Sequence, residues 1–340
     1  MKSFKKIPFV LGLVAMAASA SAQKSSGFHV TGNFPIKSSG NWDYITVDGT
    51  GKRLFVSHAT QVNVLSLKGD SVGVIASTNG VHGIALVPEL NKGYTSNGKD
   101  NNCTVFDLAT LKPLAQVSVG TNPDAIFYDE STKKVYVFNG RSMDASVIDP
   151  ATDKVVATIP LGGKPEAGVS DGKGHVFVNL ETTNEVVKID SKTYKVAGRY
   201  KLEGGEEPSG LAIDRATNRL FVGCGGNGQM LVVNSLTGKT MAKFKIGDCD
   251  GVAFDPALKL AFSSNREGTL SVVQEVSADK FVQLANVATE LSARTLALDP
   301  STHKIYLPAA KVEEVKATAD NPKARPHLVP GTFHVIEVSK

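Results

Sequence analysis

The segment Ala125-Ile-Phe-Tyr-Asp129-Glu-Ser-Thr-Lys-Lys-Val135-Tyr-Val137 decides the fold of this chain. An apolar run ends in an aspartate, a polar turn follows, and a second apolar run carries an aromatic residue. Two short apolar runs joined by a tight polar turn are typical of a β-hairpin. The segment therefore predicts two adjacent antiparallel strands.

The same hairpin pattern recurs along the chain. Its copies begin at positions 44, 83, 125, 167, 210, 251 and 295, a spacing of 39 to 44 residues. Two further strand-like runs lie between successive copies, as in 146–148 followed by 155–159. Four short strands in each repeat of about 40 residues are typical of a propeller blade. The sequence predicts an all-β, seven-bladed β-propeller of four-stranded antiparallel blades, forming one domain over residues 23–340.

The two ends of the chain predict how the ring closes. Only one clear strand, 332–338, follows the last copy, so the seventh blade lacks its outer strand. Residues 28–36 precede the first copy and have no blade of their own. We expect this N-terminal strand to complete blade seven, because that pairing removes an open sheet edge.

Residues 1–22 have the pattern of a secretory signal peptide. Three lysines precede an apolar run from Ile7 to Ala18, and Ala20-Ser-Ala22 offers small residues for cleavage after Ala22. The apolar run is too short to span about 30 Å of hydrocarbon, so we expect no membrane insertion of the mature chain. The sequence predicts a periplasmic or secreted protein.

The net charge disfavours nucleic acid as a partner. The chain has 37 Lys and Arg against 33 Asp and Glu. Cleavage after Ala22 would remove three lysines and no acid, which leaves the mature chain near +1. Binding to phosphates needs a basic surface. We expect a monomer that binds a small molecule or a protein.

One polar position recurs at the entrance to each innermost strand, and it should ring the mouth of the central channel. Its residues are Asp43, His82, Asp124, Glu166, Ser209, Asp250 and Arg294. One interpretation is a ligand site with a divalent cation held by His82, Asp124 and Glu166, because such ions take carboxylate oxygens and imidazole nitrogen. The alternative is structural, because acids also cap turns and accept backbone hydrogen bonds.

A second polar set follows ten residues after the end of the first strand in several copies. It comprises His58, Asn97, Asn139 and Asn265, with Arg141 and Arg266 close behind. Arginine at these positions and at Arg294 is suited to hold a carboxylate or phosphate. Asparagine also stabilises its own turn, which is the structural alternative.

Three cysteines and one long loop complete the candidate features. In an oxidising compartment we expect a disulfide between Cys224 and Cys249 with Cys103 free, the alternative being three reduced thiols. Residues 311–331 form a long connection with three prolines. Such a loop is either a functional lid or disordered. As a lid it would place Arg325 and His327 nearest to a ligand.

The repeats resemble the YVTN-repeat, YncE-like propellers of exported bacterial proteins. Tyr136-Val-Phe-Asn139 is similar to the tetrapeptide that names the family, with looser copies at 55–58, 94–97 and 262–265. The resemblance covers residues 28–340. It implies the propeller fold, and one such protein is described as binding DNA, while relatives in the wider superfamily hold haem or metal. Blades five and seven depart from the family pattern with Cys224 and Ala309.

Three functions stay open at this point. The sequence lacks a G-x-S-x-G elbow, a P-loop, a dinucleotide fingerprint and a Cys-x-x-Cys-His haem motif. The first expectation is an exported scaffold that binds a ligand or partner at its channel mouth. The second is a metal- or histidine-assisted hydrolase or lyase, similar to lactonases. The third is nucleic-acid binding, which only the resemblance supports.

Overall fold

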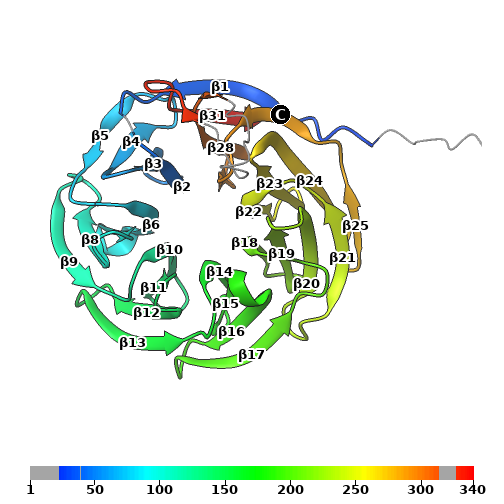
Figure 1. Cartoon of the computed structure of the whole chain (residues 1–340), viewed down its shortest axis with the longest axis horizontal. Helices are drawn as coiled ribbons and strands as arrows, with labels where there is room; N and C mark the ends of the chain where they lie inside the picture. The colour runs from blue at the N-terminus through cyan, green and yellow to red at the C-terminus, as the bar shows by residue number, and fades with distance from the viewer. Residues whose placement is uncertain (1–22, 39, 314–326) are drawn as a thin grey trace, which may run out of the picture.

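The computed structural model describes residues 23–38, 40–313 and 327–340, so the predicted signal peptide lies outside the described residues. In this part of the chain, seven antiparallel sheets are arranged in a ring around a central axis (Figure 1). A cavity lined by the inner strands lies along this axis, and we call it the channel. Each blade is ordered from the channel to the rim, as in β2-β3-β4-β5 of blade one. The predicted seven-bladed propeller is confirmed.

The strands repeat in four positions. The innermost strands are β2 (Trp42–Asp48), β6 (Val81–Val87), β10 (Pro123–Asp129), β14 (Pro165–Ser170), β18 (Pro208–Asp214), β22 (Cys249–Asp255) and β27 (Ala297–Asp299). The second strands are β3 (Arg53–His58), β7 (Lys92–Asn97), β11 (Lys134–Asn139), β15 (His175–Leu180), β19 (Arg219–Cys224), β23 (Leu260–Asn265) and β28 (Lys304–Ala309).

The outer half of each blade follows the same order. The third strands are β4 (Gln61–Ser66), β8 (Asn102–Asp107), β12 (Asp144–Asp149), β16 (Glu185–Asp190), β20 (Gln229–Asn234), β24 (Glu267–Ser277) and β31 (His334–Ser339). The outermost strands are β5 (Ser71–Ile75), β9 (Pro113–Ser118), β13 (Lys154–Pro160), β17 (Lys195–Lys201), β21 (Thr240–Lys245), β25 (Lys280–Gln283) and β1 (His29–Pro35).

A few short elements lie outside this scheme. Strand β26 (Val287–Leu291) pairs with β24 beside blade six. Two 3-10 helices, η1 (Pro88–Leu90) and η2 (Glu181–Thr183), occupy loops. Strands β29 (Val312–Glu313) and β30 (His327–Leu328) pair at the base of the long loop. Arg325 of that loop lies outside the described residues.

The first strand of the chain closes the ring. Blade seven has the order β1-β31-β28-β27, so residues from both ends of the chain share one sheet. Phe28, just before β1, packs edge to face on Phe262 of blade six with ring centroids 5.1 Å apart. The predicted closure by the N-terminal strand is confirmed.

The core consists of apolar clusters between neighbouring blades. Each second strand contributes an aromatic side chain, at most 1% exposed, to the cluster it shares with the following blade, and β11 contributes two. They are Phe55, Tyr94, Tyr136, Phe138, Phe177, Phe221, Phe262 and Tyr306. Burying such a side chain contributes roughly 1.5–3 kcal/mol. Because an aromatic residue of each blade packs against the next blade, contacts between neighbouring blades stabilise the ring.

The aspartates that end most inner strands organise turns on the face opposite the predicted mouth. The Asp48 carboxylate accepts the backbone N–H of Gly51, and that of Asp299 accepts the N–H of Ser301. An aspartate that accepts the N–H of a residue two or three positions later stabilises a tight turn. In these blades the hairpin turns hold the first two strands in register.

All three cysteines are buried free thiols, so the structure lacks the predicted Cys224–Cys249 disulfide. Cys224 belongs to the cluster between blades four and five, whereas Cys249 belongs to the cluster between blades five and six. The sheet of blade five lies between them, because successive strand residues point to opposite faces. Cys249 therefore meets Gly223 rather than Cys224: a Cβ at Gly223 would lie 2.5 Å from the Cys249 sulfur.

Candidate functional site

A β-bulge aims the predicted ring of polar side chains at the channel mouth. In six blades the ring residue is the second residue of the inner strand, and the pairing register shifts at that point, as between Trp42 and Ile45 or between Pro123 and Ile126. A bulge adds an unpaired residue and turns a side chain out of the regular alternation. The repeated sequence position thus becomes a repeated position in space.

Serines of the second strand hold two of these bulges. In blade one, Ser57 accepts the backbone N–H of Asp43 at 3.0 Å and donates to the carbonyl of Tyr44 at 2.9 Å. In blade two, Ser96 accepts the N–H of Gly83 and donates to the carbonyl of Asp124 in the next blade. The hydroxyls satisfy the backbone groups that the bulge leaves without sheet partners.

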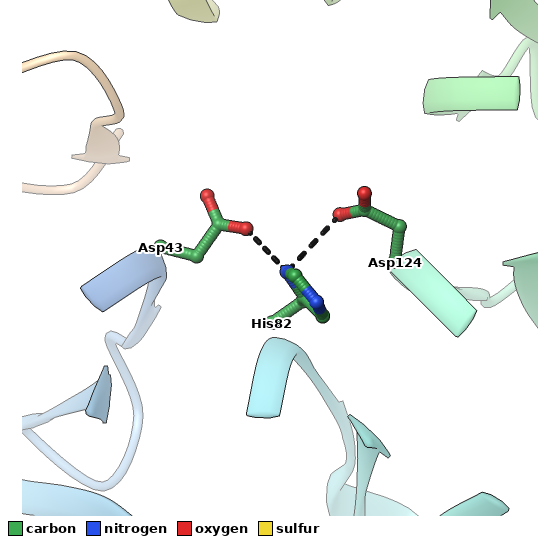
Figure 2. A group of neighbouring side chains, drawn as sticks. All are labelled: Asp43, His82 and Asp124. Atoms are coloured by element: carbon green, nitrogen blue, oxygen red, sulfur yellow. Dashed lines mark hydrogen bonds and ion pairs between the residues drawn. The ribbon is translucent and has the colours of Figure 1, made fainter. Parts of the chain in front are cut away.

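An ion-pair chain links ring residues of five blades. The Arg294 guanidinium bonds Asp250 at 2.5 Å and lies 3.4 Å from the Asp43 carboxylate. The other oxygen of Asp43 lies 2.7 Å from Nδ1 of His82, and the Asp124 carboxylate lies 3.6 Å from the same nitrogen. Figure 2 shows both carboxylates directed at the imidazole from opposite sides.

Glu166 does not join His82, which corrects the predicted ligand set. Its carboxylate lies 2.7 Å from Nζ of Lys164, which also bonds Glu181. Among the described residues, the group whose donor atoms approach one another closely enough to hold a metal is Asp43, His82 and Asp124. We call the set Asp43, His82, Asp124, Lys164, Glu166, Asp250 and Arg294 the mouth cluster.

Burial and crowded negative charge shift the protonation of the mouth cluster. Burial, together with the Asp43 charge, raises the pKa of Asp124 to about 6. Burial and the Asp124 charge also raise the pKa of Glu166 well above its usual range. For His82 burial alone would lower the pKa, but the hydrogen bond to Asp43 and the two aspartate charges outweigh it and raise the pKa.

Tyr44 is a functional candidate that the sequence reasoning passed over. The other blades carry Gly83, Ala125, Ala167, Gly210, Gly251 or Thr295 at this position. Small residues are needed there because neighbouring inner strands approach closely: a Cβ at Gly210 would lie 2.7 Å from the Val252 nitrogen. The single large residue at a small-residue position was the signal for Tyr44.

Tyr44 extends across the channel, close to the carboxylates of the mouth cluster. Its ring packs against the cluster shared by blades three and four, across the channel from its own blade. Burial first, and then the charges of Asp124, Glu166 and other mouth carboxylates, raise the pKa of Tyr44 well above its ordinary value. Tyr44, Phe127 and Asp250 line a channel cavity of about 190 Å³. Through Asp250 the mouth cluster borders this cavity.

His58 does not reach the mouth cluster. It is 1% exposed, its ring stacks on Phe333 at 4.0 Å, and its two nitrogens bond Ser38 and the carbonyl of Gly40. Burial lowers the pKa of His58. These contacts give His58 a structural role at the seam between blades seven and one.

The two arginines that follow the second polar set in sequence, Arg141 and Arg266, differ in whether they reach the mouth cluster. Arg266 contacts Asp248 at 3.0 Å and Asp250 at 3.3 Å, which joins it to the edge of the mouth cluster. Arg141 is exposed in the turn after β11, and no described ion pair connects it to that cluster. The structure therefore brings Arg266 to the predicted site and leaves Arg141 outside it.

The asparagines of the second set have structural roles within their blades. Asn139 donates to Asp144 at 2.6 Å and to Ser146 at 3.0 Å on the neighbouring strand β12. Asn97 and Asn265 bond the third strands of their own blades in the same way. The structural alternative holds for these three residues.

Comparison with solved structures supports the fold. The chain is similar to a chain of Kuenenia stuttgartiensis hydrazine synthase, with a TM-score of 0.70 and 18% identity over 83% of this chain and 95% of that one. It is also similar to the structure of U3-55K (TM-score 0.74, 9% identity, 93% and 99% covered) and to the RRP9 WD40 repeats (0.75, 10%, 94% and 99%). At these identities the likeness shows the propeller fold alone.

No family model and no curated protein matches the chain. The propeller fold is therefore shown, whereas membership of the YVTN-repeat family stays a prediction. Within the described residues, no helix is both long and apolar enough to cross a membrane.

Proposed function

We propose that this protein is an exported binding propeller that captures a positively charged group at its channel mouth. The mouth cluster carries that proposal. The four carboxylates of the mouth cluster and that of Asp248 lie there, against the guanidinium groups of Arg294 and Arg266 and the Lys164 ammonium, with His82 able to add one positive charge. A site with an excess of one charge attracts ligands of the opposite charge. The export part of the proposal rests on residues 1–22.

The raised pKa values of two mouth carboxyl groups support a positively charged ligand. Burial and neighbouring carboxylates raise the pKa of Asp124 and of Glu166, so their ionised forms are costly without a counter-charge. A bound cation would relieve that cost. An anionic ligand would add to it.

The experiment compares small probes of opposite charge. Spermidine and arginine amide should bind by calorimetry, more weakly as salt rises, whereas acetate and phosphate should bind at least tenfold more weakly. The double variant Glu166→Gln with Asp250→Asn should lower the affinity for spermidine about tenfold. Asp70→Asn, which removes one exposed carboxylate from a turn on the opposite face, is the control. Tighter binding of the anions, or an equal effect of the control, contradicts the proposal.

A second candidate is a metal- or histidine-assisted hydrolase or lyase. It is favoured by one observation, an imidazole between two carboxylates at an open mouth. Hydrolysis of simple lactones and aryl esters, measured with and without added Zn²⁺, tests it. Activity that is lost in His82→Ala would support catalysis at the mouth, and activity unchanged in that variant would place it elsewhere.

Nucleic acid is a poorer fit to this face. Phosphate groups that approached the mouth would meet Asp43, Asp124 and Asp250. A gel-shift assay at low salt measures this directly. Micromolar retention of duplex DNA would reverse the order of these functions.

A further inference from the structure

We infer that Asp43, His82 and Asp124 form a binding site for a divalent first-row transition-metal ion of the zinc or manganese type. The inference rests on the proposed capture of cations at the mouth and names the cation. It assigns the ligand atoms as Oδ2 of Asp43, Nδ1 of His82 and Oδ1 of Asp124.

The three atoms already lie at distances that suit one ion. All are within 4.8 Å of one another, and Nδ1 of His82 is 2.7 Å from one carboxylate and 3.6 Å from the other. Ligand oxygens and nitrogens lie about 2.0–2.2 Å from Zn²⁺, which places neighbouring ligands roughly 3–3.5 Å apart in a tetrahedral site. The two separations from Nδ1 of His82 bracket this spacing, and Figure 2 shows both carboxylates directed at the imidazole.

The Asp124 carboxylate is the second observation that points to a ligand. It is 15% exposed and directed at His82, yet among the described residues no side chain or backbone group donates a hydrogen bond to it. Its nearest charged partner is the imidazole nitrogen at 3.6 Å. A half-buried carboxylate that receives no hydrogen bond from the protein is free to act as a metal ligand.

Neighbouring groups orient the other two ligands. Arg294 lies 3.4 Å from Oδ1 of Asp43, which leaves Oδ2 directed at His82. Gly98 leaves room for the imidazole, because a Cβ there would lie 2.7 Å from Nε2. Outer residues that fix the direction of ligating side chains are a regular feature of metal sites. The blades thus preorganise the donors without metal.

The donor set selects the class of ion. One imidazole nitrogen and two carboxylate oxygens suit Zn²⁺ or Mn²⁺, whereas Ca²⁺ and Mg²⁺ prefer all-oxygen surroundings. Three protein ligands would leave one coordination position of a tetrahedral ion for water or a bound group. Glu166 is excluded from the set because Lys164 holds its carboxylate.

Equilibrium dialysis with elemental analysis tests the site in the purified protein, with Zn²⁺ as the probe and Mg²⁺ as the comparison. We expect one Zn²⁺ per chain, and at least tenfold weaker binding in Asp43→Asn, His82→Ala and Asp124→Asn. Asp100→Asn removes one carboxylate from the exposed turn after β7, outside the mouth cluster, and it should change the affinity less than threefold. Equal weakening in all four variants, or no stoichiometric Zn²⁺, overturns the inference.

Two further measurements keep the result interpretable. Co²⁺ added to the unmodified protein should give visible absorption bands typical of mixed nitrogen and oxygen ligands, which requires no variant to fold. Spermidine binding, measured in parallel, separates the two proposals. If spermidine binds and Zn²⁺ and Co²⁺ do not, the metal site is wrong and cation capture stands. If none binds, both are wrong.

Discussion

Gly98 lies against the imidazole of His82 so closely that a Cβ at position 98 would come within 2.7 Å of Nε2. The turn after β7 thereby determines where His82 can lie between Asp43 and Asp124. One added methyl group would displace a ring that belongs to a different strand.

Gly98→Ala should therefore weaken Zn²⁺ binding about tenfold without removing any charge. The added carbon pushes the imidazole away from its position between the two carboxylates. Calorimetric titration measures the affinity, and the melting temperature reports on folding. Gly198→Ala is the matched control, since the nearest atom to its Cβ would be 3.7 Å away. Equal affinities in the two variants would show that Gly98 does not position His82.

Asp124→Asn should stabilise the metal-free protein at neutral pH. Burial raises the pKa of Asp124 from 3.8 to about 6, so the folded state binds this proton more tightly than the unfolded state. The wild-type protein then loses stability as pH rises from about 4 to about 6, by an amount on the order of 1–3 kcal/mol. The asparagine variant has no such loss.

The gain in melting temperature of Asp124→Asn over wild type, measured with a chelator present, should be larger at pH 7.5 than at pH 4. Asp70→Asn in an exposed turn serves as the control and should show no such pH dependence. A gain that is the same at both pH values would mean that burial of Asp124 does not raise its pKa.

Phe28→Ala should lower the free energy of unfolding by about 3 kcal/mol, because it removes a buried aromatic ring from the ring-closing contact and leaves a cavity. Phe28 is 7% exposed and contacts Phe262 across the join between blades six and seven. Val30→Ala changes a neighbouring side chain that is 41% exposed and should cost less than about 0.5 kcal/mol. Chemical denaturation of both variants measures the difference, and similar losses would argue against closure through this contact.

Thiol titration of the denatured, unreduced protein should find three free thiols per chain. Cys224 and Cys249 belong to clusters on opposite sides of the blade-five sheet, and both are free thiols in the folded structure. Burial raises the pKa of all three thiols, which slows their oxidation in the folded state. A result of one free thiol per chain would show that two of the cysteines form a disulfide in the protein.

The fold was predictable because the same sequence repeat predicts every blade. Each copy supplies the apolar strands, the turn and the buried aromatic, so seven weak signals reinforce one assignment. The ring of mouth residues was predictable for the same reason, since one repeat position maps to one place around the channel. Closure by β1 followed from the strand that blade seven lacked.

The pairing within the mouth was not predictable from the repeat. Whether His82 meets Asp43 or Glu166 depends on Arg294 and Lys164, which compete for the same carboxylates. The burial of His58 depends on Phe333, which is distant in sequence. Such contacts depend on side-chain geometry between blades, which a repeat position alone does not specify.

Closure by β1 also has a consequence for the order of folding. Thr31 of β1 bonds Glu337 of β31, a contact that spans 306 residues of the chain. Contacts of such sequence separation form late and slow the folding rate, because a very long loop must close first. During synthesis β1 has to wait, unpaired, until almost the whole chain has emerged. Pairing of β1 with β31 is therefore the last step in closing the ring. Until that step, blade seven has an unpaired strand edge through which the chain can aggregate.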